Sequence, residues 1–228
     1  PLFRIGKVGK SEEESIPTTA TRIAELNIKE SEFYILIQSS NYHHRTGGFF
    51  NPFLIGTSKS INEKVISNFL KSFFLMGVIL IMSLYHFGLY SLRRKDLGSF
   101  WFGVLCFVLF LREGTTETFL MQFVDQSSFL FHLNSKLEYS TMFLGSAVFL
   151  TFLNEILKDY FSKKIILFYW ISGVIYTLIM LFTSPSIYTK TIFLTSSQFI
   201  SFTCILYALI NIFRAALKKA EYSRILAL

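Results

Sequence analysis

The stretch from Ser72 to Leu92 reads SFFLMGVILIMSLYHFGLYSL and is followed directly by Arg93, Arg94 and Lys95. Its roughly 21 residues carry no formal charge, and as an α-helix they would be about 31 Å long. That length matches the hydrocarbon core of a lipid bilayer. No polar residue recurs every three or four positions, as it would on a helix with one face in water. The stretch therefore predicts a transmembrane helix.

The composition of the whole chain also indicates a membrane protein. Hydrophobic residues make up 52% of its 228 residues and charged residues only 16%, whereas soluble domains average about 25% charged residues. The net charge is +7. Because the cations lie between apolar runs, we interpret them as markers of the orientation of the chain in a membrane and not as a nucleic-acid-binding surface. The two cysteines, Cys106 and Cys204, lie inside apolar runs, which excludes a disulfide framework.

Four further apolar runs predict four more spans. With the first, they cover about residues 72–92, 97–112, 138–157, 164–183 and 191–213, and a sixth helix would start at Tyr222. We expect the polar residues 113–136 to form a loop with an interfacial helix. In the third span, the small residues Gly145, Ser146 and Ala147 would allow a neighbouring helix to approach closely. Residues 72–228 are thus predicted to form a transmembrane helical bundle.

Residues 1–60 differ in composition, with frequent charges and short apolar runs. Residues 3–8, 23–28, 33–38 and 49–55 are rich in strand-forming side chains, and Gly47 and Gly48 are expected to form a turn with positive φ. We interpret this region as the C-terminal part of an extracellular β domain whose other strands lie upstream of Pro1. The pattern becomes helical at Ser58, so that residues 61–71 form a juxtamembrane helix continuous with the first span.

The distribution of cations predicts the orientation of the chain. The segments after spans one, three and five are rich in cations, namely Arg93, Arg94, Lys95, Lys158, Lys163, Lys164, Arg214, Lys218, Lys219 and Arg224. The alternate segments hold only Arg112, Lys136 and Lys190. Cytoplasmic loops carry the excess of Lys and Arg. The N-terminal domain is therefore expected outside the cytoplasm, and the segment after the fifth span inside it.

The neighbouring histidines His43 and His44 invite a metal-site interpretation, which we reject. Adjacent residues on a strand point to opposite faces, and no cysteine or nearby carboxylate completes a tetrahedral set. We expect one histidine to be buried and hydrogen-bonded to backbone groups, and the other to be exposed. An alternative is that an exposed histidine, with Arg45 and Asn41, binds an acidic or sugar-like ligand.

His86 and Glu155 are the ionisable groups inside the predicted spans. An ionisable residue within a membrane is a functional hypothesis by default, and this pair would line the path of a small multi-pass transporter or channel. However, Glu155 lies within a turn of Lys158, and the spans lack the repeated charges and paired broken helices of transporters. The sequence shows no catalytic constellation and no cofactor motif, so we expect neither enzyme activity nor a cofactor.

Three stretches resemble bacterial seven-transmembrane receptors with diverse intracellular signalling modules. SNYHHRTGGF at residues 40–49, followed by Gly56, is similar to the end of the extracellular second domain of that family. GVILIMSLYHFGLYSLRRKD at residues 77–96 resembles the family's first helix and basic loop, and LREG at residues 111–114 fits the end of its second helix.

This resemblance implies a β-jelly-roll sensor domain, seven helices and a cytoplasmic output module such as a kinase, a cyclase or a phosphatase. The expected function is that of a sensory receptor fragment in the bacterial cytoplasmic membrane. It would pass an extracellular signal through the helix bundle to an output domain absent from these residues. The expected partners are the bilayer, a small, carbohydrate-like extracellular molecule, the output domain in cis and, as an option, a second copy of the chain. Nucleic acid is not expected.

Overall fold

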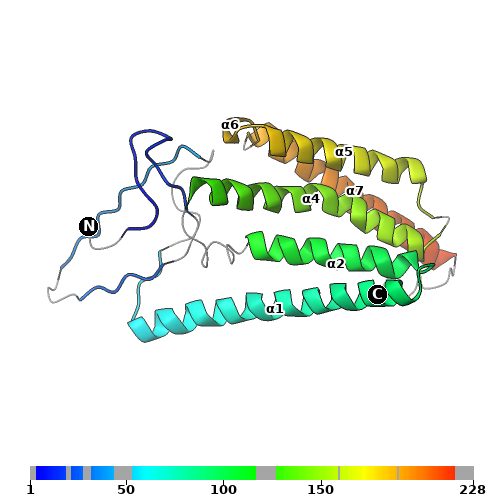
Figure 1. Cartoon of the computed structure of the whole chain (residues 1–228), viewed down its shortest axis with the longest axis horizontal. Helices are drawn as coiled ribbons and strands as arrows, with labels where there is room; N and C mark the ends of the chain where they lie inside the picture. The colour runs from blue at the N-terminus through cyan, green and yellow to red at the C-terminus, as the bar shows by residue number, and fades with distance from the viewer. Residues whose placement is uncertain are drawn as a thin grey trace.

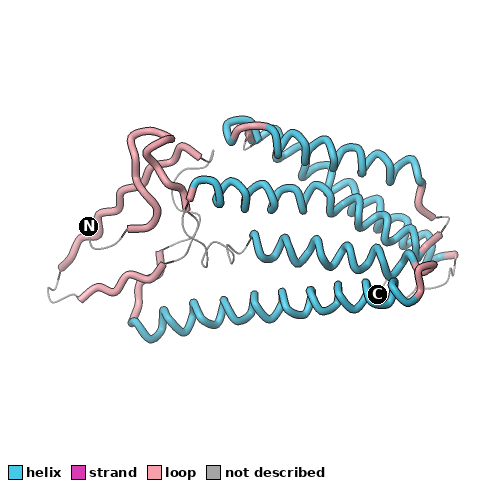
Figure 2. The backbone as a smooth tube through the Cα atoms, viewed as in Figure 1, coloured by secondary structure: helices cyan, strands magenta, loops and turns pink. Residues whose placement is uncertain are grey.

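A computed structural model describes residues 4–18, 22–27, 32–43, 53–116, 127–158, 160–188 and 190–218. Its helices, in chain order, are α1 (Ser58–Leu92), α2 (Leu97–Thr116), α4 (Ser128–Ile156), α5 (Lys163–Phe182), α6 (Pro185–Tyr188) and α7 (Thr191–Leu217). The five long helices lie side by side and alternate in direction (Figure 1). The described N-terminal segments lie as loops at the end of the bundle where α1 and α4 begin (Figure 2).

Helix α1 is continuous over 35 residues, so the predicted juxtamembrane helix and first span form one helix. The Thr57 side chain caps its first turn by accepting a hydrogen bond from the backbone N–H of Ser60. At 1.5 Å per residue, α1 is about 52 Å long, well beyond the hydrocarbon thickness of a bilayer. It therefore forms a rigid connection from the N-terminal segment into the bundle.

The loop predicted at residues 113–136 is shorter than expected. Helix α2 continues to Thr116, and α4 begins at Ser128, because the Ser127 side chain accepts a hydrogen bond from the backbone N–H of Leu130. Residues 128–136 belong to α4 and are not loop, which corrects the prediction. Residues 117–126 lie outside the described residues, so the predicted interfacial helix remains untested there.

Among the residues that the structure describes, four helices, α1, α2, α5 and α7, have the length and hydropathy to cross a membrane. Helix α4, which contains the predicted third span, is more polar because its first turns carry Asn134, Lys136 and Glu138. It nevertheless holds the central position, in contact with α2, α5 and α7. Its side chains Ala147 and Leu150 are fully buried. Any displacement of α4 would therefore change its packing against three neighbouring helices.

Two glycines set the closest approaches between helices. A Cβ on Gly103 of α2 would lie 3.0 Å from the Phe87 ring of α1, and the Ser83 hydroxyl of α1 donates to the Gly103 carbonyl oxygen at 2.9 Å. A Cβ on Gly173 of α5 would lie 2.7 Å from the Phe143 carbonyl oxygen of α4. Hydrogen bonds and small residues of this kind drive helix association in lipid.

The small residues predicted at positions 145–147 lie at helix contacts, although they do not set the tightest one. Ala147 is fully buried, and the Ser146 hydroxyl lies 3.4 Å from the Ser201 hydroxyl of α7. The nearest atom to a Cβ on Gly145 would be a methyl of Val108, at an ordinary 3.8 Å. A methyl group would therefore fit at Gly145 but not at Gly173.

The described N-terminal residues contain no β-strand, only one antiparallel bridge in which Lys7 and Ile16 exchange two backbone hydrogen bonds of 3.1 and 2.9 Å. Within residues 33–37, exposure alternates as in a strand. Tyr34 and Leu36 are more than 90% exposed, whereas the odd-numbered residues are about half exposed. A strand needs a neighbouring strand to satisfy its backbone groups, and in the described part of the chain this segment has none. The predicted turn at residues 47 and 48 lies outside the described residues.

Candidate functional site at the N-terminal end of the bundle

The N-terminal segment is joined to the bundle through a buried histidine. His43 is only 6% exposed, although it lies in a loop. Its Nε2 lies 3.0 Å from the Ser15 hydroxyl oxygen, and its Nδ1 lies 3.1 Å from Nε2 of His132 on α4. Because the two histidines lie 89 positions apart in the sequence, this contact fixes one part of the fold against another.

The hydrogen-bonded chain continues from His132 into α6. Nδ1 of His132 lies 3.1 Å from the hydroxyl oxygen of Tyr188, whose side chain is 1% exposed. The Ser127 cap sets the start of α4 and places His132 in its second turn. The Ser184 carbonyl accepts the N–H groups of Ile187 and Tyr188 and so forms the short α6 turn. We call Ser15, His43, His132 and Tyr188 the histidine chain.

The surroundings of His132 and Tyr188 favour the neutral forms of these two side chains. Burial, foremost, and then His43 and Lys136 lower the pKa of His132, while Glu12 acts in the opposite direction. Burial, aided by Tyr139, raises the pKa of Tyr188 to about 12. The Glu12 carboxylate lies 4.0 Å from His43 Nδ1, but its side chain is 62% exposed and therefore well screened by solvent.

The predicted ligand residues that the structure describes differ in exposure. Asn41 and Tyr42 are exposed, whereas His43 points inward. The partners of His43 are side chains and not the expected backbone groups. His44 and Arg45 lie outside the described residues. Ligand binding by Asn41, His43, His44 and Arg45 therefore stays a prediction.

His132 is the residue that sequence reasoning missed. It lies in the polar stretch that we interpreted as loop, and its partners are distant in sequence. The one available local signal was Ser127, whose hydroxyl is suited to capping a helix that would include His132. Nothing in the sequence pairs it with His43.

The structure does not join the two predicted intramembrane groups, His86 and Glu155. The His86 ring packs edge-on against Phe102 of α2, with centroids 4.5 Å apart, and its buried Nδ1 has no hydrogen-bond partner in the described part of the chain. Glu155 is half-buried near the end of α4. Among the described residues, no ion pair links Glu155 to Lys158.

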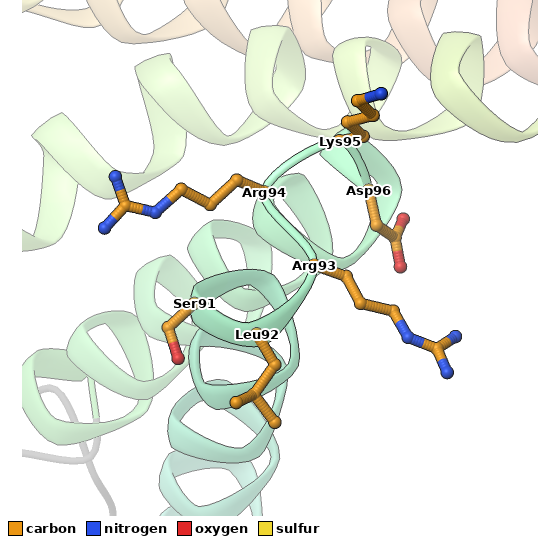
Figure 3. Close-up of a pocket in the computed structure, with 6 residues that line it drawn as sticks. All are labelled: Ser91, Leu92, Arg93, Arg94, Lys95 and Asp96. Atoms are coloured by element: carbon orange, nitrogen blue, oxygen red, sulfur yellow. The ribbon is translucent and has the colours of Figure 1, made fainter.

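The opposite end of the bundle is strongly basic. In the loop between α1 and α2, the side chains of Arg93, Arg94 and Lys95 fan out in different directions (Figure 3). Asp96 turns back to cap α2 by accepting the Ser99 N–H at 3.1 Å and the Ser99 hydroxyl at 2.7 Å. The α4–α5 loop and the end of α7 lie at this same end (Figure 1) and add Lys158, Lys163, Lys164, Arg214 and Lys218.

Within the described ranges, no group of three or more His, Cys, Asp or Glu side chains is arranged to hold a metal ion. Residues 68–228 match the family described as 7TM diverse intracellular signalling. The chain matches no curated protein and no solved structure. The matched region begins inside α1 and includes every later helix of the bundle.

Proposed function

The chain belongs to the 7TM diverse intracellular signalling family, and from this premise we propose that it is the sensing and transmembrane part of a receptor. A signal received by the N-terminal domain biases the arrangement of the helix bundle. The bundle in turn biases a cytoplasmic signalling domain attached in cis. Enzyme activity, such as kinase, cyclase or phosphatase chemistry, belongs to that output domain and not to these residues.

The observation that carries this proposal is the hydrogen bond between His43 and His132. It connects the N-terminal segment to α4, which contacts α2, α5 and α7. A displacement of the segment would be transmitted through α4 to helices whose other ends carry the basic loops. A signalling domain would join the bundle at that basic end.

The proposed orientation follows from the gathering of cations at one end of the bundle. Lys and Arg accumulate on the cytoplasmic side of membrane proteins. With the basic loops in the cytoplasm, the N-terminal segment and the histidine chain lie outside it. We assign the protein to a bacterial cytoplasmic membrane, with the β-jelly-roll sensor domain exposed beyond it.

The proposed ligand is a small acidic or carbohydrate-like molecule bound by the sensor domain. The exposed residue Asn41, with His44 and Arg45 three and four positions further along, supplies polar and cationic groups for such a ligand. His43 has a different role, because it is buried against the bundle. It would report ligand binding by holding or releasing His132.

The ligand can drive this change only by binding one arrangement of the bundle better than the other. A tenfold preference corresponds to about 1.4 kcal/mol. That is similar to the contribution of one or two hydrogen bonds, at about 0.5–1.5 kcal/mol each. Loss or gain of the His43–His132 contact is therefore sufficient to couple binding to the state of the bundle.

The test uses the complete receptor in membranes, with the activity of its output domain as the readout. His132→Ala removes the contact, and Ser135→Ala is the matched control, because among the described residues the Ser135 hydroxyl donates within its own helix, to the Phe131 carbonyl oxygen. We expect His132→Ala to change basal output and Ser135→Ala to leave it unaltered, at equal membrane levels. If His132→Ala leaves the output unchanged and the protein conducts ions in proteoliposomes, the result would instead favour a transporter or channel.

A further inference from the structure

The protons of the histidine chain can be placed by counting donors and acceptors. The Ser15 hydroxyl has one proton and donates it to the Glu12 carbonyl oxygen, 3.1 Å away. Its oxygen must then accept from His43, so the proton of His43 lies on Nε2. Nδ1 of His43 is therefore an acceptor, and it accepts from Nε2–H of His132.

The same logic fixes the other end of the chain. With its proton on Nε2, His132 has a bare Nδ1, which accepts from the Tyr188 hydroxyl. This assignment satisfies all four hydrogen bonds with both imidazoles neutral. The reverse direction leaves the bond to the Glu12 carbonyl unmade. Only with both imidazoles neutral does every N–H and O–H proton of the histidine chain have an acceptor within it.

One added proton leaves the Tyr188 hydroxyl without an acceptor in the chain, whichever ring it joins. On His43 it occupies Nδ1 and donates to Nε2 of His132, 3.1 Å away, so the proton of His132 must move to its Nδ1 and the Tyr188 hydroxyl loses its acceptor. On His132 it occupies Nδ1 and forces the hydroxyl proton of Tyr188, a buried side chain, to find another acceptor. Protonation of both rings breaks the His43–His132 hydrogen bond, because it points two N–H groups at each other across 3.1 Å and places two cations with their centroids 5.2 Å apart.

The neighbouring groups do not compensate for such a charge. Among the described residues, the titratable side chains that face the histidine chain are Glu12, Lys136 and Tyr139, in addition to its own members His43, His132 and Tyr188. Lys136 is a cation and opposes protonation of His132, and Tyr188 stays uncharged. Within the described ranges, Glu12 is the group that favours a proton on His132, and its side chain is mostly exposed.

We propose that the His43–His132 contact is a proton-operated latch, which acidification outside the cytoplasm opens, releasing the N-terminal segment from α4. Reading that release as a signal rests on the proposed receptor function, whereas the latch itself does not. The direction follows from linkage: the pKa of His132 is lowered when the latch is closed, so the open state binds more protons. Closure is therefore fully favoured above the ordinary imidazole pKa of about 6.5 and weakens as the pH falls below it.

The test measures the distance between two spin labels in the complete receptor in nanodiscs, from about pH 8 to about pH 5, a range that brackets the imidazole pKa. The labels replace Tyr42, which is exposed beside His43, and Phe129, which is exposed on the first turn of α4. Cys106 and Cys204 are replaced by Ala. We expect one short distance at the higher pH, and its loss with a midpoint below about pH 6.5.

Three variants make this result specific. His132→Gln and His43→Gln cannot be protonated in this range but keep a donor and an acceptor, so the pH response should disappear from both. His86→Gln, a histidine away from the chain, should leave the response unchanged. Each sample is measured with and without a chelator; if the chelator abolishes the short distance at the higher pH, a metal holds the contact and the proposal is wrong.

The outcomes separate the latch from the receptor function. An invariant distance between the two pH extremes, or a response that survives in both glutamine variants, overturns the latch even if the receptor signals normally. The label distance could instead change with pH while the output activity of the receptor is unaffected by both pH and His132→Gln. That result would support the latch and contradict its role in signalling.

Discussion

Gly173 of α5 lies against the backbone of Phe143 of α4, so closely that a Cβ on the glycine would be 2.7 Å from the Phe143 carbonyl oxygen. Phe143 is itself 5% exposed and packs with Met180 and Tyr188. Gly173 thus sets the separation of α4 and α5 close to the cluster that includes Tyr188, a member of the histidine chain.

Replacing Gly173 with Ala should therefore destabilise the bundle. The backbone atom that the new methyl meets cannot move independently of α4, and overpacking of this kind costs about 1–3 kcal/mol. Unfolding in mixed detergent micelles measures the change. Gly77→Ala on α1 is the control, since nothing lies within 4 Å of the position that its new methyl would take. Equal stability of the two variants would contradict the packing described for α4 and α5.

Ser83→Ala should loosen the α1–α2 pair. The buried Ser83 hydroxyl donates to the Gly103 carbonyl oxygen at 2.9 Å, and hydrogen bonds between membrane helices contribute about 0.6 kcal/mol on average and up to about 1.7. The matched variant is Ser91→Ala on the same helix, where the exposed hydroxyl donates to the Gly88 carbonyl oxygen of its own helix and to no other residue in the described part of the chain. The same unfolding measurement should show a larger loss for Ser83→Ala; the reverse order would refute the assignment.

Asp96→Ala should destabilise α2 by about 1 kcal/mol, the usual cost of losing an N-cap, whereas Asp96→Asn should cost less. Hydrogen bonds from the Ser99 hydroxyl and then its backbone N–H lower the pKa of Asp96 below its ordinary 3.8. Because the pKa of Asp96 is lower in the folded than in the unfolded protein, the ionised carboxylate stabilises the fold fully at any pH above the unfolded-state pKa. This stabilisation is lost as the pH falls through the lower, folded-state pKa. Unfolding of the wild type and Asp96→Ala across the acid range checks this: their difference should shrink only at the acid end.

Reporter fusions test the proposed orientation. Fusions at Ile55 and Ser127 should behave as extracytoplasmic, and fusions at Asp96 and Lys218 as cytoplasmic, because Lys and Arg accumulate in cytoplasmic loops. Cytoplasmic behaviour at Ile55 would overturn both the receptor proposal and the direction in which the latch is exposed.

The bundle could be predicted from sequence because hydropathy over about twenty residues reports directly on the bilayer. The stretch from Ser72 to Leu92 lies within α1, and the helical pattern from Ser58 correctly anticipated its extension. The start of α4 was predicted about ten residues too late. Its first turns carry polar groups that resemble a loop in hydropathy, while the Ser127 cap and the contacts of His132 make them helical.

The candidate site could be predicted only in part. The sequence singled out His43 and His44 by their chemistry, but the partner of His43 lies on a helix whose N-terminal turns were interpreted as loop. Contacts between distant segments depend on packing that no local pattern contains. For the same reason, Gly145 was expected to mark a close approach, whereas Gly103 and Gly173 provide the tight ones.

The central claim is that the N-terminal segment controls the arrangement of the basic end through α4. The most direct measurement places spin labels at Arg94, in the α1–α2 loop, and at Lys158, after α4, in the complete receptor in nanodiscs, and compares wild type, His132→Ala and Ser135→Ala. The account predicts that the distance distribution shifts in His132→Ala and matches the wild type in Ser135→Ala. Identical distributions in all three, with the His43–His132 contact shown to be lost in His132→Ala, would contradict it.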